Sequence, residues 1–142
     1  MRNTILATGL GVLLLLCGSC KKDYSLSIAG TWEIRSAQNS MIPTISYPPG
    51  NDSLLKFTNT TYAVYSKGQM IKSGTYRVVE DHSFNALSVS SGQFTHRIIY
   101  DGNSGGYKIF LQVTGNELRF LAGDFSVDGG SDVRYERTEM GM

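Results

Sequence analysis

Residues 107–122 read YKIFLQVTGNELRFLA, and this stretch decides the fold. Apolar and polar side chains alternate on both sides of Thr114-Gly115-Asn116, which is typical of a β-hairpin with a glycine-containing turn. The same alternation recurs over residues 28–138, with glycine, asparagine and aspartate between the alternating segments. No segment of this region has the 3.6-residue period of an amphipathic helix. The sequence therefore predicts an all-β domain.

The expected strands follow one another through tight turns, which predicts an antiparallel up-and-down meander of roughly eight or nine strands, one of them at residues 86–90. Most connections are too short for the crossovers of a Greek-key sandwich. Closing the meander into a small barrel also removes the exposed edges that an open sheet must protect. Alternation gives residues 94–100 an inward face that carries Phe94, His96, Ile98 and Tyr100.

One connection departs from the tight-turn pattern. Residues 38–51 contain all three prolines of the chain, together with Met41, Ile42, Ile45 and Tyr47. Proline cannot donate to a sheet ladder, and it stiffens an extended loop. We expect a loop that covers one end of the barrel, either as a plug of ordinary core or as a lid that gates a ligand.

The N-terminus is expected to be an export signal. Arg2 precedes an apolar run over residues 5–16, whereas a helix that spans the bilayer needs about 20 apolar residues. Gly18-Ser19-Cys20 then resembles the small-small-cysteine end of the lipobox that lipoprotein signal peptidase cleaves, although Cys17 stands where that pattern prefers leucine. Cleavage before Cys20 divides the chain into a signal peptide (1–19), a lipidated tether (20–27) and a barrel domain (28–142).

Cysteine content and charge narrow the function classes. Of the 142 residues only Cys17 and Cys20 are cysteines, and one of them remains after cleavage, so no disulfide framework or thiolate metal site is expected. A thioether-linked lipid and a palmitate-type acyl amide on Cys20 would supply about three acyl chains and a lasting membrane anchor. With Lys21 and not aspartate after this cysteine, the chain resembles Gram-negative lipoproteins that reside in the outer membrane. With 13 basic and 12 acidic residues, the chain lacks the charge of a nucleic-acid-binding protein.

Gly30-Thr31-Trp32, at the start of the first expected strand, matches the Gly-x-Trp motif of lipocalin-like barrels. The hairpin region 54–79 and the end of the last strand, residues 135–138, fit the same pattern. Over residues 28–138 the chain resembles the small lipocalin-like domains of bacterial envelope lipoproteins. The resemblance implies a closed barrel floor built from Gly30, Trp32 and Arg137, with the basic side chain crossing the indole ring. Two departures are the absence of the Thr-Asp-Tyr-type motif and of a helix after the barrel.

The inward aromatic set predicts non-catalytic binding of a small, largely apolar molecule. The residues expected to line the space are Trp32, Phe57, Tyr76, His96 and Tyr135, with Met41 and Tyr47 closing it. A solid core explains the same aromatic residues equally well, because an eight-stranded barrel can be filled by its own side chains. The alternative function is therefore a protein-interaction or inhibitor module that acts on an envelope partner through the loops at 101–106 and 123–131.

Enzymatic function has no support in the sequence. There is no Gly-x-Ser-x-Gly nucleophile elbow and no phosphate-binding Gly-rich loop between a strand and a helix. His96 is interpreted as a core histidine rather than an acid–base group. The carboxylates Asp124, Asp128 and Asp132 lie among glycines and indicate turns rather than a metal site. We therefore expect no catalytic residues, no metal and no cofactor.

Overall fold

The computed structural model describes residues 26–39, 41–84, 93–123 and 129–138. Cys20, the expected signal peptide and the expected strand at residues 86–90 lie outside these residues. The described part contains strands and no helix. Its strands are β1 (Gly30–Asn39), β2 (Ile42–Ser46), β3 (Leu54–Phe57), β4 (Thr61–Ser66), β5 (Gln69–Glu80), β6 (His96–Tyr100), β7 (Ile109–Thr114), β8 (Glu117–Ala122) and β9 (Ser131–Arg137).

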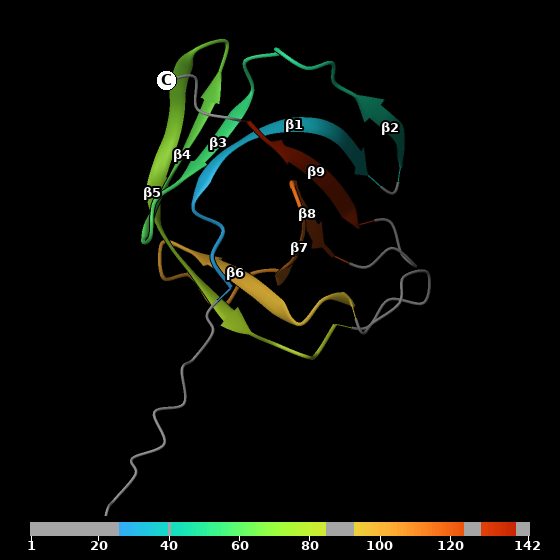
Figure 1. Cartoon of the computed structure of the whole chain (residues 1–142). Helices are drawn as coiled ribbons and strands as arrows, with labels where there is room; N and C mark the ends of the chain where they lie inside the picture. The colour runs from blue at the N-terminus through green and yellow to red at the C-terminus, as the bar shows by residue number, and fades with distance from the viewer. Residues whose placement is uncertain (1–25, 40, 85–92, 124–128, 139–142) are drawn as a thin grey trace, which may run out of the picture.

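All strand pairs are antiparallel, and the first strand closes the sheet (Figure 1). The strand order is β2-β1-β3-β4-β5-β6-β7-β8-β9, with an additional pairing of β1 with β9. Strands β1 and β3 to β9 therefore form a closed eight-stranded barrel in chain order, and β2 is an extra strand at its margin. The predicted all-β class and closed antiparallel barrel are confirmed.

The proline-rich connection differs from the expected loop. Strand β1 continues to Asn39, and β2 pairs back onto its second half, with Ala37 opposite Ile45. Pro43 lies inside β2, which stands at the end of the strand order, and a strand with only one partner tolerates the missing donor. Every residue of β2 is exposed. The expectation of a loop over residues 38–51 was wrong for Ile42–Ser46, where Pro43 hid the strand, whereas residues 47–51 lie outside any strand.

The floor of the barrel is packed around Trp32. Trp32, Ile28 and Leu118 are fully buried, and the indole Nε1 donates a hydrogen bond of 2.9 Å to the carbonyl oxygen of Ile28. The guanidinium of Arg137 lies 4.2 Å from the centre of the indole ring and donates to the carbonyl of Ala29. Gly30 has a φ of 139°, and a Cβ there would collide with this guanidinium. The structure thus places Gly30, Trp32 and Arg137 together at one end.

A second apolar cluster packs outside the barrel. Its members are Phe84, Phe94, Phe110 and Leu121. Phe110 and Leu121 face each other across β7 and β8, and their neighbours Leu111 and Phe120 belong to the interior cluster, so alternation points Phe110 and Leu121 outward. The rings of Phe84 and Phe94 lie 4.8 Å apart. The expected inward position of Phe94 was wrong, because β6 begins at His96 and alternation does not extend to Phe94.

Candidate functional site

One layer above the floor the barrel interior is not filled. In β9 Tyr135 lies two residues before Arg137, and in β8 Phe120 lies two residues after the floor residue Leu118. Side chains at this level surround a cavity of about 170 Å³, which we call the upper cavity. Its lining residues come from six strands and are Leu55, Tyr62, Val64, Lys72, Tyr100, Phe120 and Tyr135.

Aromatic rings form most of the wall of the upper cavity. The rings of Tyr62 and Tyr100 meet edge to face at 4.7 Å, and those of Phe120 and Tyr135 do so at 5.9 Å. Edge-to-face contacts fix ring positions and leave flat faces available to a bound molecule. The hydroxyl of Tyr62 donates to Asp101 Oδ2 at 3.0 Å, which holds this ring in place.

Gly74 of β5 makes room for this arrangement. It lies opposite Tyr62 in the register of β4 and β5. A Cβ at this position would lie 2.9 Å from Cε1 of Tyr62 and would collide with the carboxylate of Asp101. Asp101 also accepts a hydrogen bond of 2.9 Å from the backbone nitrogen of Thr75. The missing side chain at Gly74 thus lets the Tyr62–Asp101 contact form beside the cavity.

Two phenol groups of the cavity, those of Tyr100 and Tyr135, remain protonated at neutral pH. Burial, with a contribution from nearby Tyr47, raises the pKa of Tyr135 to about 12. Burial raises the pKa of Tyr100 further still, assisted by the neighbouring tyrosines. Both groups therefore present a neutral hydroxyl that can donate a hydrogen bond.

Lys72 is the charged residue of the lining. It lies opposite Val64 and shares its face of β5 with Gly74 and Tyr76. Its side chain is exposed, and its ammonium group lies 5.8 Å from the centre of the Tyr62 ring. Among the described residues no carboxylate lies within ion-pair distance of Lys72. Within this part of the chain the ammonium group of Lys72, at the rim of the upper cavity, therefore has no ion-pair partner.

A second hollow adjoins the upper cavity. It has a volume of about 220 Å³ and shares Leu55, Val64 and Tyr135 with it. Its other lining residues are Ile34, Ser53, Leu54, Tyr65, Ser66 and Ile71. Several of them lie at the ends of β3 and β4 that are remote from the floor. This hollow extends the interior space toward the end of the barrel opposite Trp32.

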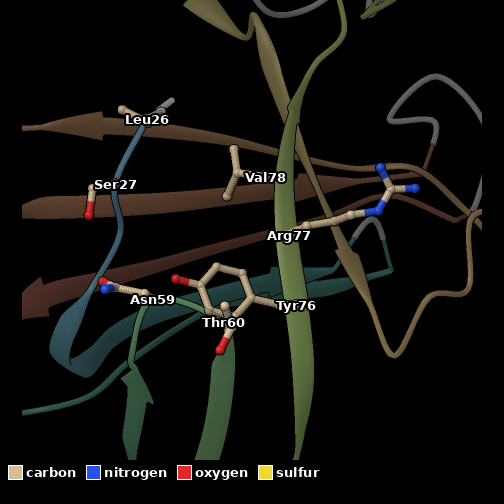
Figure 2. A pocket seen from close by; sticks show the side chains of 7 residues that line it. All are labelled: Leu26, Ser27, Asn59, Thr60, Tyr76, Arg77 and Val78. Atoms are coloured by element: carbon tan, nitrogen blue, oxygen red, sulfur yellow. The ribbon is translucent and has the colours of Figure 1, made fainter. Parts of the chain in front are cut away.

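The structure brings one of the predicted ligand-binding residues to the upper cavity, namely Tyr135. Trp32 and Phe57 are buried in the core cluster and do not line the upper cavity. The ring of Tyr76 packs edge to face on Phe57 at 4.7 Å, and its hydroxyl donates to the carbonyl of Thr58. Tyr76 instead borders a different hollow of about 310 Å³ beside Leu26, which Figure 2 shows.

His96, Met41 and Tyr47 do not line the upper cavity. His96 is half-buried, and its Nδ1 lies 2.9 Å from the hydroxyl of Thr95. Met41 is 73% exposed next to β2. Tyr47 is half-buried, and it contributes electrostatically to the raised pKa of Tyr135.

Sequence reasoning missed Tyr62, Val64 and Lys72 as lining residues. The signal for Tyr62 and Val64 is the alternation within β4, which puts both on the face of the buried residues. Lys72 shares its face of β5 with Tyr76, which was expected to point inward. A lysine in this pattern is easily assigned to solvent, since only its long apolar stem needs to reach the interior.

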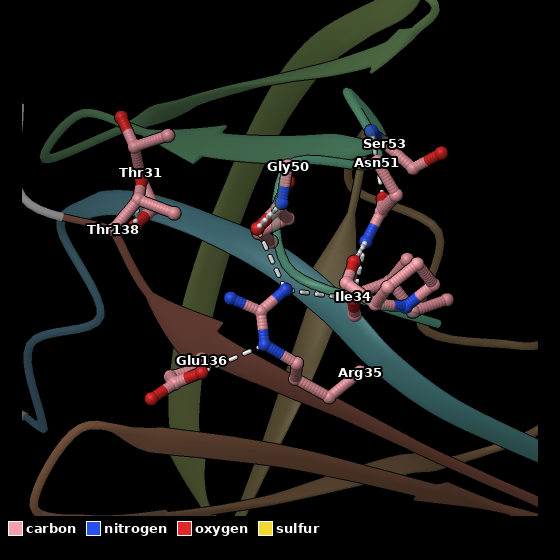
Figure 3. A network of polar contacts seen from close by, with 10 residues as sticks. Thr31, Ile34, Arg35, Gly50, Asn51, Ser53, Glu136 and Thr138 are labelled. Carbon is pink, nitrogen blue, oxygen red and sulfur yellow. Dashed lines mark hydrogen bonds and ion pairs between the residues drawn. The ribbon is translucent and has the colours of Figure 1, made fainter. Parts of the chain in front are cut away.

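A polar network holds the segment that follows β2 against β1 (Figure 3). The carboxylate of Glu33 accepts hydrogen bonds from Arg35 Nη1 at 2.6 Å and from the backbone nitrogen of Gly50 at 3.1 Å. Asn51 donates to the carbonyl of Ile34 at 3.0 Å. Arg35 also binds Glu136 of β9 at 2.7 Å. These bonds fix the second half of the proline-rich connection to the barrel wall.

The Glu33→Gln variant tests this network. Burial raises the pKa of Glu33, but the bonds from Arg35 and Gly50 outweigh it and hold the pKa below its usual value of 4.5. Since Glu33 is only 5% exposed, the substitution should lower the free energy of unfolding at pH 7 by about 1–3 kcal/mol. Because the folded-state pKa is lowered, this contribution is complete above about pH 4.5 and disappears as the pH falls through the folded-state value.

The measurement is urea unfolding of the wild type and the variant from pH 7 to pH 3. The difference between the two unfolding free energies should shrink below about pH 4.5. Glu136→Gln is the matched control, because Glu136 binds the same arginine but its side chain is 53% exposed. A pH-independent difference, or an equal loss in both variants, would contradict the assignment.

Comparisons with family models, with curated proteins and with solved structures give no match for this chain. Across the described residues there is no helix of the length and apolarity that a membrane crossing requires. The same residues contain no group of three or more histidine, cysteine or acidic side chains placed to hold a metal ion. The functional proposal rests on the upper cavity, whose lining combines aromatic rings with the ammonium group of Lys72.

Proposed function

We propose that this chain is a lipid-anchored, lipocalin-like protein that binds a small, largely apolar molecule in the upper cavity without changing it chemically. The observation that carries the proposal is the space of about 170 Å³ among aromatic and aliphatic side chains, directly above a fully packed floor. Small-molecule sites combine such an apolar wall with a few polar groups that fix orientation. Here the hydroxyls of Tyr100 and Tyr135 and the ammonium group of Lys72 are those groups.

The lining chemistry supports binding rather than catalysis. Its ionisable groups are three phenols and one ammonium group, and no lining residue is a histidine, cysteine, serine or carboxylate. General acid–base catalysis works best with a group whose pKa lies near the working pH. Burial moves the pKa of Tyr100 and Tyr135 away from neutrality.

The proposed anchor is the lipid on Cys20, in the outer membrane. The end of the tether is attached to the barrel, because Leu26 packs against the core cluster and Ile28 belongs to it. Ile28 also accepts the hydrogen bond from Trp32, so the chain enters the barrel at the floor. The anchor would therefore hold the floor toward the membrane and leave the upper cavity facing away from it.

A second candidate function rests on a different observation. Within the part of the chain that the structure describes, six large apolar side chains are exposed, and they are Met41, Ile42, Ile45, Met70, Ile71 and Tyr107. All six lie in or next to the connections β1–β2, β4–β5 and β6–β7, which are at the end of the barrel remote from the floor. Clustered exposed apolar residues mark interaction surfaces. These exposed apolar side chains favour the alternative function, an interaction module for an envelope partner.

The Val64→Phe variant distinguishes a binding cavity from a solid barrel. Val64 lines both hollows, so a phenylalanine there should occupy the space that a ligand would use. We expect the affinity for benzyl alcohol, a neutral single-ring probe, to fall at least about tenfold, or at least about 1.4 kcal/mol. The measurement is isothermal titration calorimetry of the full chain in detergent, with empty micelles as the blank.

Val79→Phe is the matched control, since Val79 lies on the opposite face of β5 from Val78 and pairs with Arg97. It should leave the affinity unchanged. Native mass spectrometry of the full chain taken from its membranes should also show a small-molecule adduct that Val64→Phe loses. If the wild type binds no benzyl alcohol and carries no adduct, the binding proposal is wrong and the interaction module remains.

A further inference from the structure

The upper cavity by itself has about the volume of one ring. A cavity of about 150 Å³ in another protein takes up benzene, and sites for drug-sized molecules begin at about 300 Å³. The upper cavity has a volume of about 170 Å³. Its walls are ring faces and edges from Tyr62, Tyr100, Phe120 and Tyr135. One six-membered ring fits this space, and a longer group would have to extend into the adjoining hollow of about 220 Å³.

The charge of the cavity selects the substituent on that ring. Lys72 lies at the rim, where its ammonium group is exposed and has no carboxylate partner among the described residues. The interior hydroxyls of Tyr100 and Tyr135 remain protonated, so they act as donors. A group that accepts hydrogen bonds and carries a negative charge satisfies both features. A cationic group would meet repulsion from Lys72 and would find no anionic partner in the lining.

Asp101 is the carboxylate that contacts a lining residue, and its position does not change this conclusion. Its Oδ2 accepts from the hydroxyl of Tyr62, and its Oδ1 accepts from the backbone nitrogen of Thr75. Asp101 does not line the cavity. Both oxygens of this carboxylate therefore already accept hydrogen bonds outside the cavity. Lys72 is the charged group that a ligand would meet at the rim.

We propose that the upper cavity binds a single-ring organic acid, with the ring among the aromatic side chains and the carboxylate paired with Lys72. This inference rests on the proposed binding function and specifies its ligand class. The carboxylate would lie at the rim, where Lys72 remains in contact with water and the desolvation cost of the ion pair is small. The ring supplies apolar burial, and the charge supplies orientation and selectivity.

The test compares three probes that share one ring and differ in charge, which are benzoate, benzyl alcohol and benzylamine. Calorimetric titrations at pH 7 use the full chain in a nonionic detergent. The wild type should bind benzoate most tightly, and Lys72→Glu should weaken benzoate at least about tenfold, which corresponds to about 1.4 kcal/mol. The same variant should change the affinity for benzyl alcohol less than about twofold and should improve that for benzylamine. Raising the salt concentration should weaken benzoate alone.

Lys56→Glu is the matched control. Lys56 also lies over a tyrosine ring, at 4.5 Å from the centre of Tyr65, but it alternates with Leu55 and Phe57 and so points out of the barrel. This variant should bind all three probes like the wild type. Equal effects of the two substitutions, or a wild-type preference for benzylamine, would overturn the acid proposal. If the wild type still binds benzyl alcohol in that case, the proposed binding function remains supported. Failure of the wild type to bind any of the three probes, together with the absence of an adduct in native mass spectrometry, would overturn both.

Discussion

Replacing Trp32 by alanine should lower the free energy of unfolding by about 3–5 kcal/mol, the range for truncating a large buried aromatic residue. Trp32 is fully buried at the floor, where β1 meets both β3 and β9. The substitution opens a cavity and removes the donor to the carbonyl of Ile28. It also removes the ring on which Arg137 lies. These losses act on the contact that closes the barrel, so we expect global destabilisation.

The measurement is urea unfolding followed by far-ultraviolet circular dichroism, because Trp32 is the single tryptophan and the variant has no indole fluorescence. Trp32→Phe is the control, since it retains an aromatic ring but not the indole donor. Its loss should be clearly smaller than that of Trp32→Ala. A loss below about 1 kcal/mol in Trp32→Ala, typical of surface positions, would show that the floor is not packed as described.

Local alternation predicts the hairpins, because hairpins pair neighbouring segments of the chain, whereas barrel closure joins β1 to β9 at the two ends of the domain. The hairpin around Thr114-Gly115-Asn116 forms as expected, with Val113 opposite Leu118. The strand β2 is different, since Pro43 interrupts the alternation on which the prediction depends. The register of β1 against β9 also shifts between Ile34 and Ser36. A bulge of this kind depends on both strands and is not encoded in either one alone.

The candidate site could be predicted only in part. Alternation identifies side chains that point inward, and it correctly predicts that Tyr135 packs against the interior cluster. It does not give the height of a side chain along the barrel axis, which depends on the stagger between strands. Phe57 and Tyr135 were therefore grouped together, although Tyr135 lines the upper cavity and Phe57 does not. The volumes of the surrounding rings then decide which layer remains open.

The Phe94→Ala variant should also lose about 3–5 kcal/mol of unfolding free energy, although Phe94 lies outside the barrel interior. Phe94 is only 1% exposed. Its ring packs on Phe84 at 4.8 Å and belongs to the cluster that includes Phe110 and Leu121. The guanidinium of Arg119 lies 5.5 Å from its centre. Removing this ring therefore opens a cavity on the outer face of β7 and β8.

The loss should extend to a neighbouring ion pair. Arg119 donates two hydrogen bonds to the largely buried Asp132, at 3.0 and 2.6 Å. A buried pair of this kind stabilises the fold only while its packing and hydrogen bonds are complete. Water that enters beside Arg119 in the variant should weaken the pair, which adds to the lost apolar contacts.

Urea unfolding measures the effect, and Tyr107→Ala is the control for loss of an aromatic ring at the surface. Tyr107 is 91% exposed, so its removal should change the unfolding free energy by less than about 0.5 kcal/mol. Phe94→Ala should leave the affinity for benzyl alcohol unchanged, because the outer cluster and the upper cavity lie on opposite faces of the sheet. An affinity loss as large as that of Val64→Phe would show that Phe94 points into the barrel, as alternation alone predicts. Equal stability losses in Phe94→Ala and Tyr107→Ala would instead show that the outer cluster is not packed.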